Sequence, residues 1–380
     1  MSIVVQKYGG SSVADIQKLK SVAQHVIETK NAGNDVVVVV SAMGNTTNEL
    51  LALARSVSES PGRRELDMLI SVGERISMAL LSMAINDLGH AAVSFTGSQS
   101  GIITDENHAA ARIVAVRPWR IKEALDDNKI AIVAGFQGMS TAREVTTLGR
   151  GGSDLTAVAL TAALDADRCE ILSDVDGIWS ADPRKAPTAR QLATLSWDEA
   201  IHLFRGGAKV LHAAAAAFAH HHGIQVDALA TKASNGGTTI STDPRMSSGR
   251  VVAVTVDDQL LQIEPTTGSI QDLVEYAEKI GAPLRHVDAH AVTVDARDFY
   301  EDTQSEWPGG TRPSPVAVAT ATGLGAGTPA NLLAGLRVLN EAGIKARHAT
   351  LEPDRLQWTL AVGDASDAES LLHDALVGLP

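Results

Sequence analysis

Along roughly the first 245 residues, short apolar runs rich in β-branched residues alternate with longer stretches whose apolar positions recur at helical spacing. The first helical stretch begins near Ile16 and meets a stop signal at Asn31 to Gly33. This alternation predicts a mainly parallel sheet covered by helices, an α/β three-layer sandwich. The runs expected to form strands are 3–5, 36–40, 92–95, 130–134, 170–172 and 225–229.

Polar or glycine-containing clusters follow several of these runs directly. Ser41 follows one run, Thr96 to Ser98 another, Gly135 and Phe136 a third, and Asp174 a fourth. In open α/β sheets, ligands bind at the edge formed by the carboxyl ends of the strands. The placement therefore favours one composite site at this edge over a set of unrelated turns.

The segment from Thr146 to Asp154 combines glycines with an arginine, a hydroxyl and a carboxylate. Glycine lets backbone amides come close to an oxyanion, and a helix that opens at Ser153 would direct its positive end to the same place. A glycine-rich connection capped by Ser153, with no binding role, explains the same residues. This segment alone leaves both interpretations open.

A second glycine-rich segment, Lys7 to Ser12, also lies between an apolar run and an amphipathic helix. Neither segment has the G-x-x-x-x-G-K-[ST] pattern of a P-loop or the G-x-G-x-x-G pattern of a dinucleotide-binding fold. Two glycine loops at strand ends strengthen the prediction of a site for an anionic ligand.

From about Arg250 the pattern changes to two modules, each with the order strand, helix, strand, strand. Their first strands are expected at 251–256 and 316–320, and their helices around 270–280 and 330–342. Such βαββ units commonly bind a small ligand or mediate dimerisation. Met246, near the boundary, permits an internal start that would give a separate short subunit. The expected organisation is a domain at 1–245, a module at 246–300, a linker rich in proline, glycine and charge at 301–315, and a module at 316–380.

Composition limits the class of protein. A chain of 380 residues, 44% hydrophobic and 20% charged, has the size of two or three domains. No apolar run approaches the roughly 20 residues of a membrane helix, and no cleavable leader precedes the first strand, so we expect a cytoplasmic protein. The net charge of -13 argues against a nucleic-acid surface. The single cysteine, Cys169, excludes an internal disulfide.

Three short patterns have a metal-binding or phosphate-binding alternative. Asp174 to Gly177 is similar to part of a calcium loop, but no glutamate stands at the twelfth position. His220 to His222 end an alanine-rich helix that is expected to start at Lys209, where a solvated terminus favoured by the helix dipole explains them. Gly323 to Gly327 joins a strand to a helix, for which a tight turn suffices. We therefore predict no dedicated metal site.

Six motifs appear in order along roughly residues 1 to 240: Lys7–Val13, Ser41–Asn48, Gly73–Arg75, Thr146–Asp154, Ser173–Gly177 continuing to Asp182–Arg184, and Gly207–Leu211. Together they closely resemble the motifs of the aspartate kinase family, within the amino-acid-kinase superfamily. The resemblance implies the amino-acid-kinase fold and phosphoryl transfer from ATP to the side-chain carboxylate of L-aspartate, giving 4-phospho-L-aspartate. It also implies Mg²⁺, held mainly through the nucleotide phosphates.

The resemblance assigns catalytic and substrate-binding roles. Lys7 and Lys209 would neutralise the transferring phosphoryl group, and Asp154 would organise the site. No general base is needed, because a carboxylate nucleophile is already ionised at neutral pH. Arg150 would bind a substrate carboxylate through two hydrogen bonds, and Glu74 the α-amino group. The other positions expected to bind substrate are Ser41, Thr47 and Ser153.

Nucleotide contacts are carried over from the family in the same way. Trp179 stands where the family usually has tyrosine, and an indole can stack on adenine but lacks the hydroxyl, so the nucleotide preference stays open. The residues expected to contact nucleotide or phosphate are Lys7, Gly9, Gly10, Ser11, Ser12, Ser173, Asp174, Trp179, Asp182, Arg184 and Lys209.

The two small modules occupy the place of the family's ACT domains, which bind lysine, threonine or similar end products and mediate dimerisation. The resemblance therefore implies a homo-oligomer. Glu264 to Ser269 replaces the Asp-x-Pro-Gly turn usual in the first ACT unit, and the segment around Thr350 to Asp354 lacks the usual serine-rich pattern. Our hypothesis is that the ACT folds persist while end-product inhibition is weakened or lost.

The leading interpretation is an aspartate kinase, which is either a housekeeping enzyme or a paralogue that serves a dedicated pathway. Two other functions compete with it. One is a kinase of the same superfamily that acts on another carboxylate or amino-acid-like substrate, against which Arg150, Glu74 and Thr47 speak. The other is a nonenzymatic ligand-binding regulator. The retained charged set speaks against it: Lys7, Arg150, Asp154 and Lys209.

Overall fold

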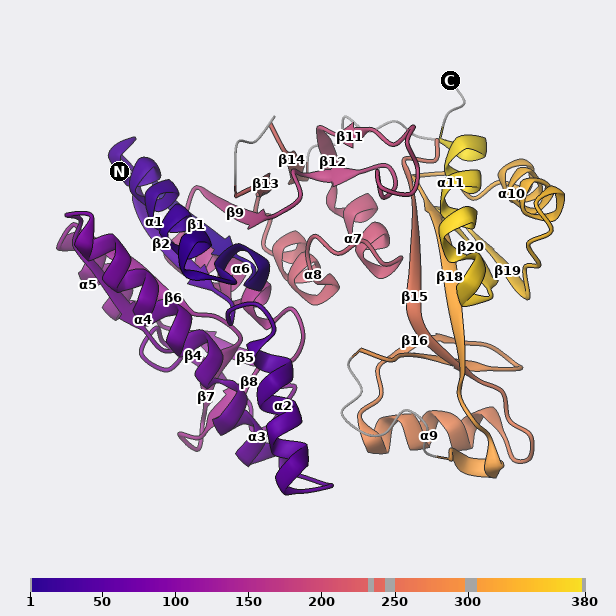
Figure 1. Ribbon diagram of the computed structural model, residues 1–380, viewed down its shortest axis with the longest axis horizontal. Helices are drawn as coiled ribbons and strands as arrows, with labels where there is room; N and C mark the ends of the chain where they lie inside the picture. Colours follow the sequence, from indigo (N-terminus) through magenta and orange to yellow (C-terminus); the bar gives the residue numbers. More distant parts are fainter. Residues whose placement is uncertain (1, 232–235, 243–249, 298–305, 378–380) are drawn as a thin grey trace. The chain divides into compact units, whose positions relative to one another are not determined.

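The computed structural model describes residues 2–231, 236–242, 250–297 and 306–377. The chain folds as two units, each with its own sheet (Figure 1). The first unit comprises Met1–Ile178, Gln191–Ile201 and Lys209–Pro244, and the second comprises Trp179–Arg190, His202–Ala208 and Arg245–Pro380. Met246 and the first five residues of the expected linker lie outside the described residues.

The first unit is built on an eight-stranded sheet with the strand order β12-β14-β13-β9-β1-β2-β6-β3. Its neighbouring strands run parallel except for the pair β13–β14, which confirms the mainly parallel sheet. The strands are β1 (Ile3–Tyr8), β2 (Asp35–Val40), β3 (Ala92–Phe95), β6 (Ile130–Ala134), β9 (Arg168–Ser173), β12 (Thr194–Ser196), β13 (Val226–Ala230) and β14 (Thr238–Ser241).

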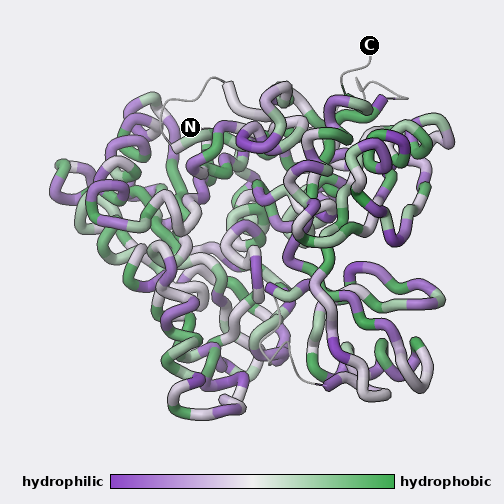
Figure 2. Tube along the Cα trace, turned by 45° about the vertical axis from the view of Figure 1, so that its right-hand side comes forward, coloured by the Kyte–Doolittle hydropathy of each residue, from purple (hydrophilic) through white to green (hydrophobic). Residues whose placement is uncertain are grey.

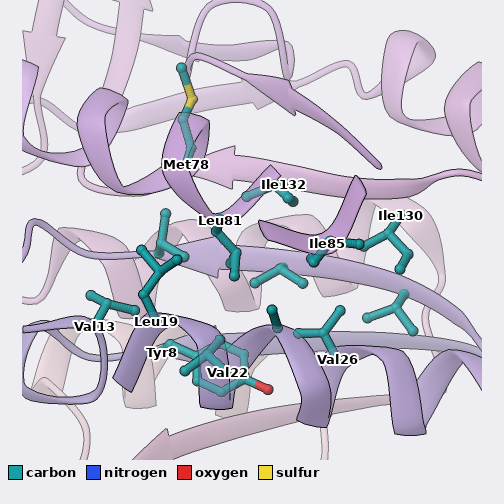
Figure 3. Packing of buried hydrophobic residues seen from close by; sticks show 14 of the residues in the cluster. Tyr8, Val13, Leu19, Val22, Val26, Met78, Leu81, Ile85, Ile130 and Ile132 are labelled. Carbon is teal, nitrogen blue, oxygen red and sulfur yellow. The ribbon is translucent and has the colours of Figure 1, made fainter. Parts of the chain in front are cut away.

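Helices cover both faces of this sheet, as the three-layer expectation requires. On one face, α1 (Ile16–Asn31) and α4 (Val72–Asp87) pack against alternate residues of β2 and β6, and Figure 3 shows Val22, Val26, Leu81, Ile85 and Ile132 in this core. On the other face lie α5 (Trp119–Asp126) and α6 (Gly152–Leu164), with α8 (Ala213–His221) packed against α6. Figure 2 shows the matching mixture of hydrophobic and hydrophilic residues along the helices.

A second, four-stranded sheet extends the first unit, with the order β5-β4-β7-β8. It consists of β4 (Ile102–Thr104), β5 (Ile113–Val116), β7 (Gln137–Ser140) and β8 (Val145–Thr147). Helix α3 (Arg63–Ile70) packs against β8 and follows α2 (Thr46–Val57). The sequence pattern did not predict this sheet, because strands of three or four residues are too short to show a clear alternation.

Helices α3 and α4 together give a 25-residue helical stretch, Arg63–Asp87, which contains an apolar window of 18 residues with a mean hydropathy of 1.5. By length and composition it could cross a membrane. Glu74 and Arg75 interrupt its apolar residues, so it contains no continuous apolar run of the length that the sequence analysis considered. Half of the apolar window is buried inside the protein. Leu81 and Ile85 in this stretch belong to the core against the central sheet, as expected of a core helix.

The second unit contains a six-stranded antiparallel sheet with the order β16-β17-β15-β18-β20-β19. The order strand, helix, strand, strand is confirmed in both halves, and the first strands of the halves, β15 and β18, pair at the centre. The elements are β15 (Ala253–Ile263), α9 (Ile270–Ile280), β16 (Leu284–Val287), β17 (Val292–Asp295), β18 (Ser314–Thr322), α10 (Pro329–Glu341), β19 (His348–Glu352), β20 (Arg355–Leu360) and α11 (Ala365–Leu376).

The remaining described elements are short. Helix α7 (Trp197–Arg205) passes from the first unit into the second, and β10 (Ile178–Trp179) pairs with β11 (Gln191–Leu192). Three short 3-10 helices lie at η1 (Gly10–Val13), η2 (Pro308–Gly310) and η3 (Val362–Asp364). The alanine-rich helix begins at Ala213 and not at Lys209, because His212 has an extended backbone and its side chain accepts a hydrogen bond from the amide of Ala214.

Candidate active site

Lys7 and Asp154 form an ion pair at the carboxyl end of β1. The Lys7 Nζ lies 2.7 Å from Asp154 Oδ1, and the two side chains are 13% and 10% exposed. Asp154 lies in the first turn of α6, and its Oδ2 accepts a hydrogen bond from the backbone amide of His212 at 3.1 Å. The carboxylate thus joins a strand, a helix start and the segment before α8.

The loop after β1 passes so close to the loop after β2 that a side chain is excluded. A Cβ atom on Gly10 would lie 2.7 Å from the carbonyl oxygen of Ala42, and the Gly10 carbonyl accepts a hydrogen bond from the Gly44 amide at 3.1 Å. A Cβ atom on Gly9 would lie 3.6 Å from Lys7 Nζ. Two glycines beside a lysine at a strand end form a backbone surface that a phosphate can approach closely.

Serine side chains connect this loop to the neighbouring strand β9. Ser11 Oγ donates to Asp174 Oδ1 at 3.4 Å, and Ser12 Oγ lies 2.9 Å from the hydroxyl of Thr231. Thr231 in turn donates to the carbonyl of Ser173. The structure therefore brings together four of the residues that were expected to contact nucleotide, and it leaves the Asp174 side chain exposed.

Glu74 is the most perturbed carboxylate of the site. It lies in the first turn of α4 with 3% exposure, and Oε1 accepts a hydrogen bond from the Ala42 amide at 3.1 Å. Oε2 is buried without a hydrogen-bond partner among the described residues. Burial raises the pKa of Glu74 to about 7, against an ordinary value of 4.5.

Ser41 and Thr47 flank the same region. Ser41 directly follows β2 and its amide donates to the Tyr8 carbonyl at 3.1 Å, while Thr47 lies in the first turn of α2. Both side chains are half-buried. A buried carboxylate with an unpaired oxygen suits a substrate with a cationic nitrogen.

Arg150 lies between two glycines that both have left-handed backbones, Gly149 with φ 73° and Gly151 with φ 69°. Its side chain is exposed. Ser153 is 7% exposed. It packs so closely against Gly135 that a Cβ atom on Gly135 would lie 2.7 Å from Ser153 Oγ. The interpretation of Ser153 as a helix cap is wrong: α6 begins at Gly152, its N-cap residue is Gly151, and no side chain caps it.

Lys209 lies exposed in the segment between α7 and α8. Three residues later, His212 donates its amide to Asp154, which holds the end of this segment beside the ion pair. No sequence motif indicated a role for His212. In the structure a Cβ atom on Gly151 would lie 2.0 Å from the Cβ of His212, so only glycine fits opposite this histidine.

Trp179, Asp182 and Arg184 belong to the second unit. Asp182 accepts two hydrogen bonds from the Arg184 side chain, at 3.0 and 2.8 Å, and these hydrogen bonds lower the pKa of the carboxyl group. The Asp182 amide donates to Glu369 of α11.

Among the described residues, no group of three or more His, Cys, Asp or Glu side chains is placed to hold a metal ion. Asp176, from the calcium-like pattern, instead accepts the Ala230 amide.

Residues 2–227, more than half of the chain, match the Amino acid kinase family. The chain therefore belongs to this family. The match also covers nearly all of the region in which the six motifs were found.

Within the family, the similar curated proteins are aspartokinases, and the chain belongs to this group. It is 47% identical to an aspartokinase of Mycolicibacterium smegmatis over 299 residues, 76% of this chain and 69% of that protein. It is 54% identical to an aspartokinase of Corynebacterium glutamicum over 242 residues, 63% of this chain and 58% of that protein. The fold is similar to that of E. coli aspartokinase III, with a TM-score of 0.80 at 22% identity, over 99% of this chain and 100% of that chain.

Proposed function

We propose that this chain transfers the γ-phosphoryl group of ATP to the side-chain carboxylate of L-aspartate, giving 4-phospho-L-aspartate and ADP. The observation that carries the proposal lies at the shared carboxyl edge of the parallel strands β1 and β2. The Lys7–Asp154 ion pair and the Gly9–Gly10 backbone lie at the end of β1, and the buried Glu74 carboxylate accepts the amide of Ala42 after β2. The E. coli relative of the same fold was crystallised with aspartate and ADP.

The reaction needs charge neutralisation more than proton transfer. The aspartate carboxylate oxygen attacks the γ-phosphorus, the bond to the β,γ-bridging oxygen breaks, and ADP leaves with the electron pair. Lys7 would stabilise the negative charge of the transferring group, and Asp154 would hold the lysine side chain in place through their ion pair. Lys209 would supply the second cation. It lies exposed in the segment between α7 and α8, whose end is held by the hydrogen bond from the His212 amide to Asp154.

Recognition of aspartate would use both ends of the substrate. The unpaired Oε2 of Glu74 would accept a hydrogen bond from the α-ammonium group, with Ser41 and Thr47 beside it. Arg150, with its fork of donors, would bind the α-carboxylate, and Ser153 would line the site at the start of α6. This arrangement selects an acidic amino acid over a simple carboxylic acid.

The nucleotide would lie along the loop after β1 and the residues that follow β9. The residues are Lys7, Gly9, Gly10, Ser11, Ser12, Ser173, Asp174 and Lys209, with Trp179, Asp182 and Arg184 assigned by resemblance alone. Mg²⁺ would be held mainly through the nucleotide phosphates. When bound, Mg²⁺ would neutralise phosphate charge.

The test is an incubation with MgATP, L-aspartate and hydroxylamine, followed by detection of aspartyl hydroxamate. Formation of hydroxamate that depends on all three reagents is the expected result. Activity with another amino acid or acid only, or no turnover in a folded preparation, would each contradict the proposal.

We further propose that residues 1–245 form the catalytic domain and that 246–300 and 316–380 are diverged ACT-like modules joined by the linker 301–315. The order strand, helix, strand, strand, which occurs twice in the second unit, supports this division into two modules. The modules would mediate homo-oligomerisation, which sedimentation or light scattering would detect. The protein would work in the cytoplasm.

A further inference from the structure

Arg150 lies in the turn between β8 and α6, where the Gly152 amide donates to the Gly149 carbonyl at 3.0 Å. The flanking residues Gly149 and Gly151 both have positive φ, a conformation in which glycine is the least restricted residue. Other segments of the chain also support this turn. One of them is the loop at 105–111, because a Cβ atom on Gly149 would lie 3.4 Å from the carbonyl oxygen of Ala109.

The Ala109 backbone is itself strained. Its φ is +70°, in the left-handed region where an alanine is disfavoured. The loop is fixed in this state by Asp67 of α3: the Ala109 amide lies 3.1 Å from both carboxylate oxygens, and His108 Nδ1 lies 2.7 Å from Oδ2. The Ala111 amide adds a hydrogen bond to the Thr147 carbonyl at 2.9 Å.

Asp67 also holds the end of β8. Thr147 Oγ1 donates to Asp67 Oδ1 at 2.5 Å, three residues before Arg150. Asp67 has 0% exposure, and a carboxylate is stable in such a place only when several donors satisfy it. Its partners come from the 105–111 loop and from β8, the two segments that lead to or support the Gly149–Gly151 segment.

We propose that Asp67 is a positioning residue for substrate binding: by joining α3, the loop around Ala109 and the end of β8, it fixes the place of Arg150. The inference rests on the proposed role of Arg150 in binding aspartate. Asp67 does not touch substrate in this scheme. Its effect reaches the site through the Ala109 carbonyl and the Thr147 backbone.

The main test compares Asp67→Asn with the unchanged protein in steady-state kinetics. An asparagine has the same shape, but its NH₂ group faces donors, so at least one of the hydrogen bonds is lost. We expect the KM for aspartate to rise about tenfold or more, since small misplacements of a binding group are costly, while the KM for ATP changes less than about twofold. Equal rises in both KM values, or no rise in a folded variant, would overturn the proposal.

Two further variants separate positioning from a general loss of stability. Thr147→Val removes one donor and no charge, and should raise the KM for aspartate by a smaller factor than Asp67→Asn. Ala109→Gly relieves the left-handed strain, so the double variant with Asp67→Asn should recover part of the lost aspartate affinity. Absence of any recovery, together with no effect of Thr147→Val, would refute the role of this hydrogen-bond network.

The matched control is Glu144→Gln. Glu144 pairs with Arg64 of α3 at 2.9 Å, so it also connects α3 to the β7–β8 hairpin, but its side chain is 39% exposed and lies at the opposite end of β8 from Arg150. Both KM values should stay within about twofold, because an exposed ion pair contributes little. A rise equal to that of Asp67→Asn would show that any loosening of α3 suffices.

Hydrogen exchange distinguishes failure of this inference from failure of the proposed function. In Asp67→Asn the amides of 148–152 should exchange faster, while those in the middle of α6 stay protected. This result supports the positioning role even if the substrate is another acid. Unchanged exchange at 148–152 would contradict it whatever the substrate.

Discussion

At the level of single residues, Lys7 is the cation that we propose to neutralise the transferring phosphoryl group. Lys7→Ala removes a cation beside Gly9 and leaves Asp154 without its ion-pair partner. We expect kcat to fall about 100-fold or more, because a preorganised charge acts most strongly in the transition state. Steady-state kinetics would measure this.

Lys30→Ala is the control for that change. Lys30 pairs with Asp35 at 2.9 Å in the same unit, with side chains 10% and 18% exposed, so the ion pair is similarly sheltered but connects α1 to β2. Its loss should leave kcat unchanged. A similar fall in both variants would mean that Lys7 acts through stability alone.

Glu74 links substrate binding to pH. Its pKa of about 7 in the folded protein means that a part of the molecules is protonated at neutral pH. An α-ammonium group favours the ionised form, so aspartate binding should release a proton near pH 7 and tighten between pH 6 and 8. Calorimetry in buffers of different ionisation enthalpy would detect the proton, and Glu74→Gln should abolish both effects.

The same residue affects stability with a defined sign. The pKa is raised on folding, so the folded state binds more protons than the unfolded state between pH about 4.5 and 7. The free energy of unfolding should therefore fall as pH rises through this window, by at most roughly 3 kcal/mol. Denaturant titrations at pH 5 and pH 8 would measure the free energy of unfolding at each pH. Glu74→Gln should reduce the difference between the two values, and an unchanged difference would contradict the assignment.

At the level of elements, the loop between β1 and α1 has a backbone position that depends on glycine. In Gly10→Ala the new Cβ would lie 2.7 Å from the Ala42 carbonyl, which is main chain and cannot rotate away. We expect the loop to shift and the KM for ATP to rise about tenfold. Gly62→Ala is the control, because that glycine has φ -60° and open space around it, and its KM values should not change.

Elements with strong patterns were predicted closely, while contacts distant in sequence were not. Strands β3 and β6 and helix α9 have the bounds that the hydrophobic pattern indicated. The Lys7–Asp154 pair joins two motifs that the resemblance had already selected. Asp67 was missed, because its partners lie more than 40 residues away and no spacing rule connects them. The cap of α6 was misassigned, because a glycine took the place expected for a serine.

At the level of the whole molecule, the second unit has the βαββ order twice, and our hypothesis is that end-product inhibition through it is weakened or lost. The segment Glu264–Ser269 enters α9 through a serine capping box instead of the usual Asp-x-Pro-Gly turn. We expect lysine and threonine, titrated into the activity assay, to leave the rate unchanged below about 1 mM. Inhibition at sub-millimolar concentration of either amino acid would refute this prediction.

The chain changes from one unit to the other five times, after residues 178, 190, 201, 208 and 244. Two early segments thus complete the second unit: Gly206 accepts a hydrogen bond from Thr255 of β15, and Lys185 pairs with the buried Glu369 of α11. A fragment that starts near residue 245, from an internal start or from cloning, would lack both segments and expose these polar groups without partners. The second unit is therefore not a transferable module, and swapping it between relatives requires exchanging three separate pieces of sequence.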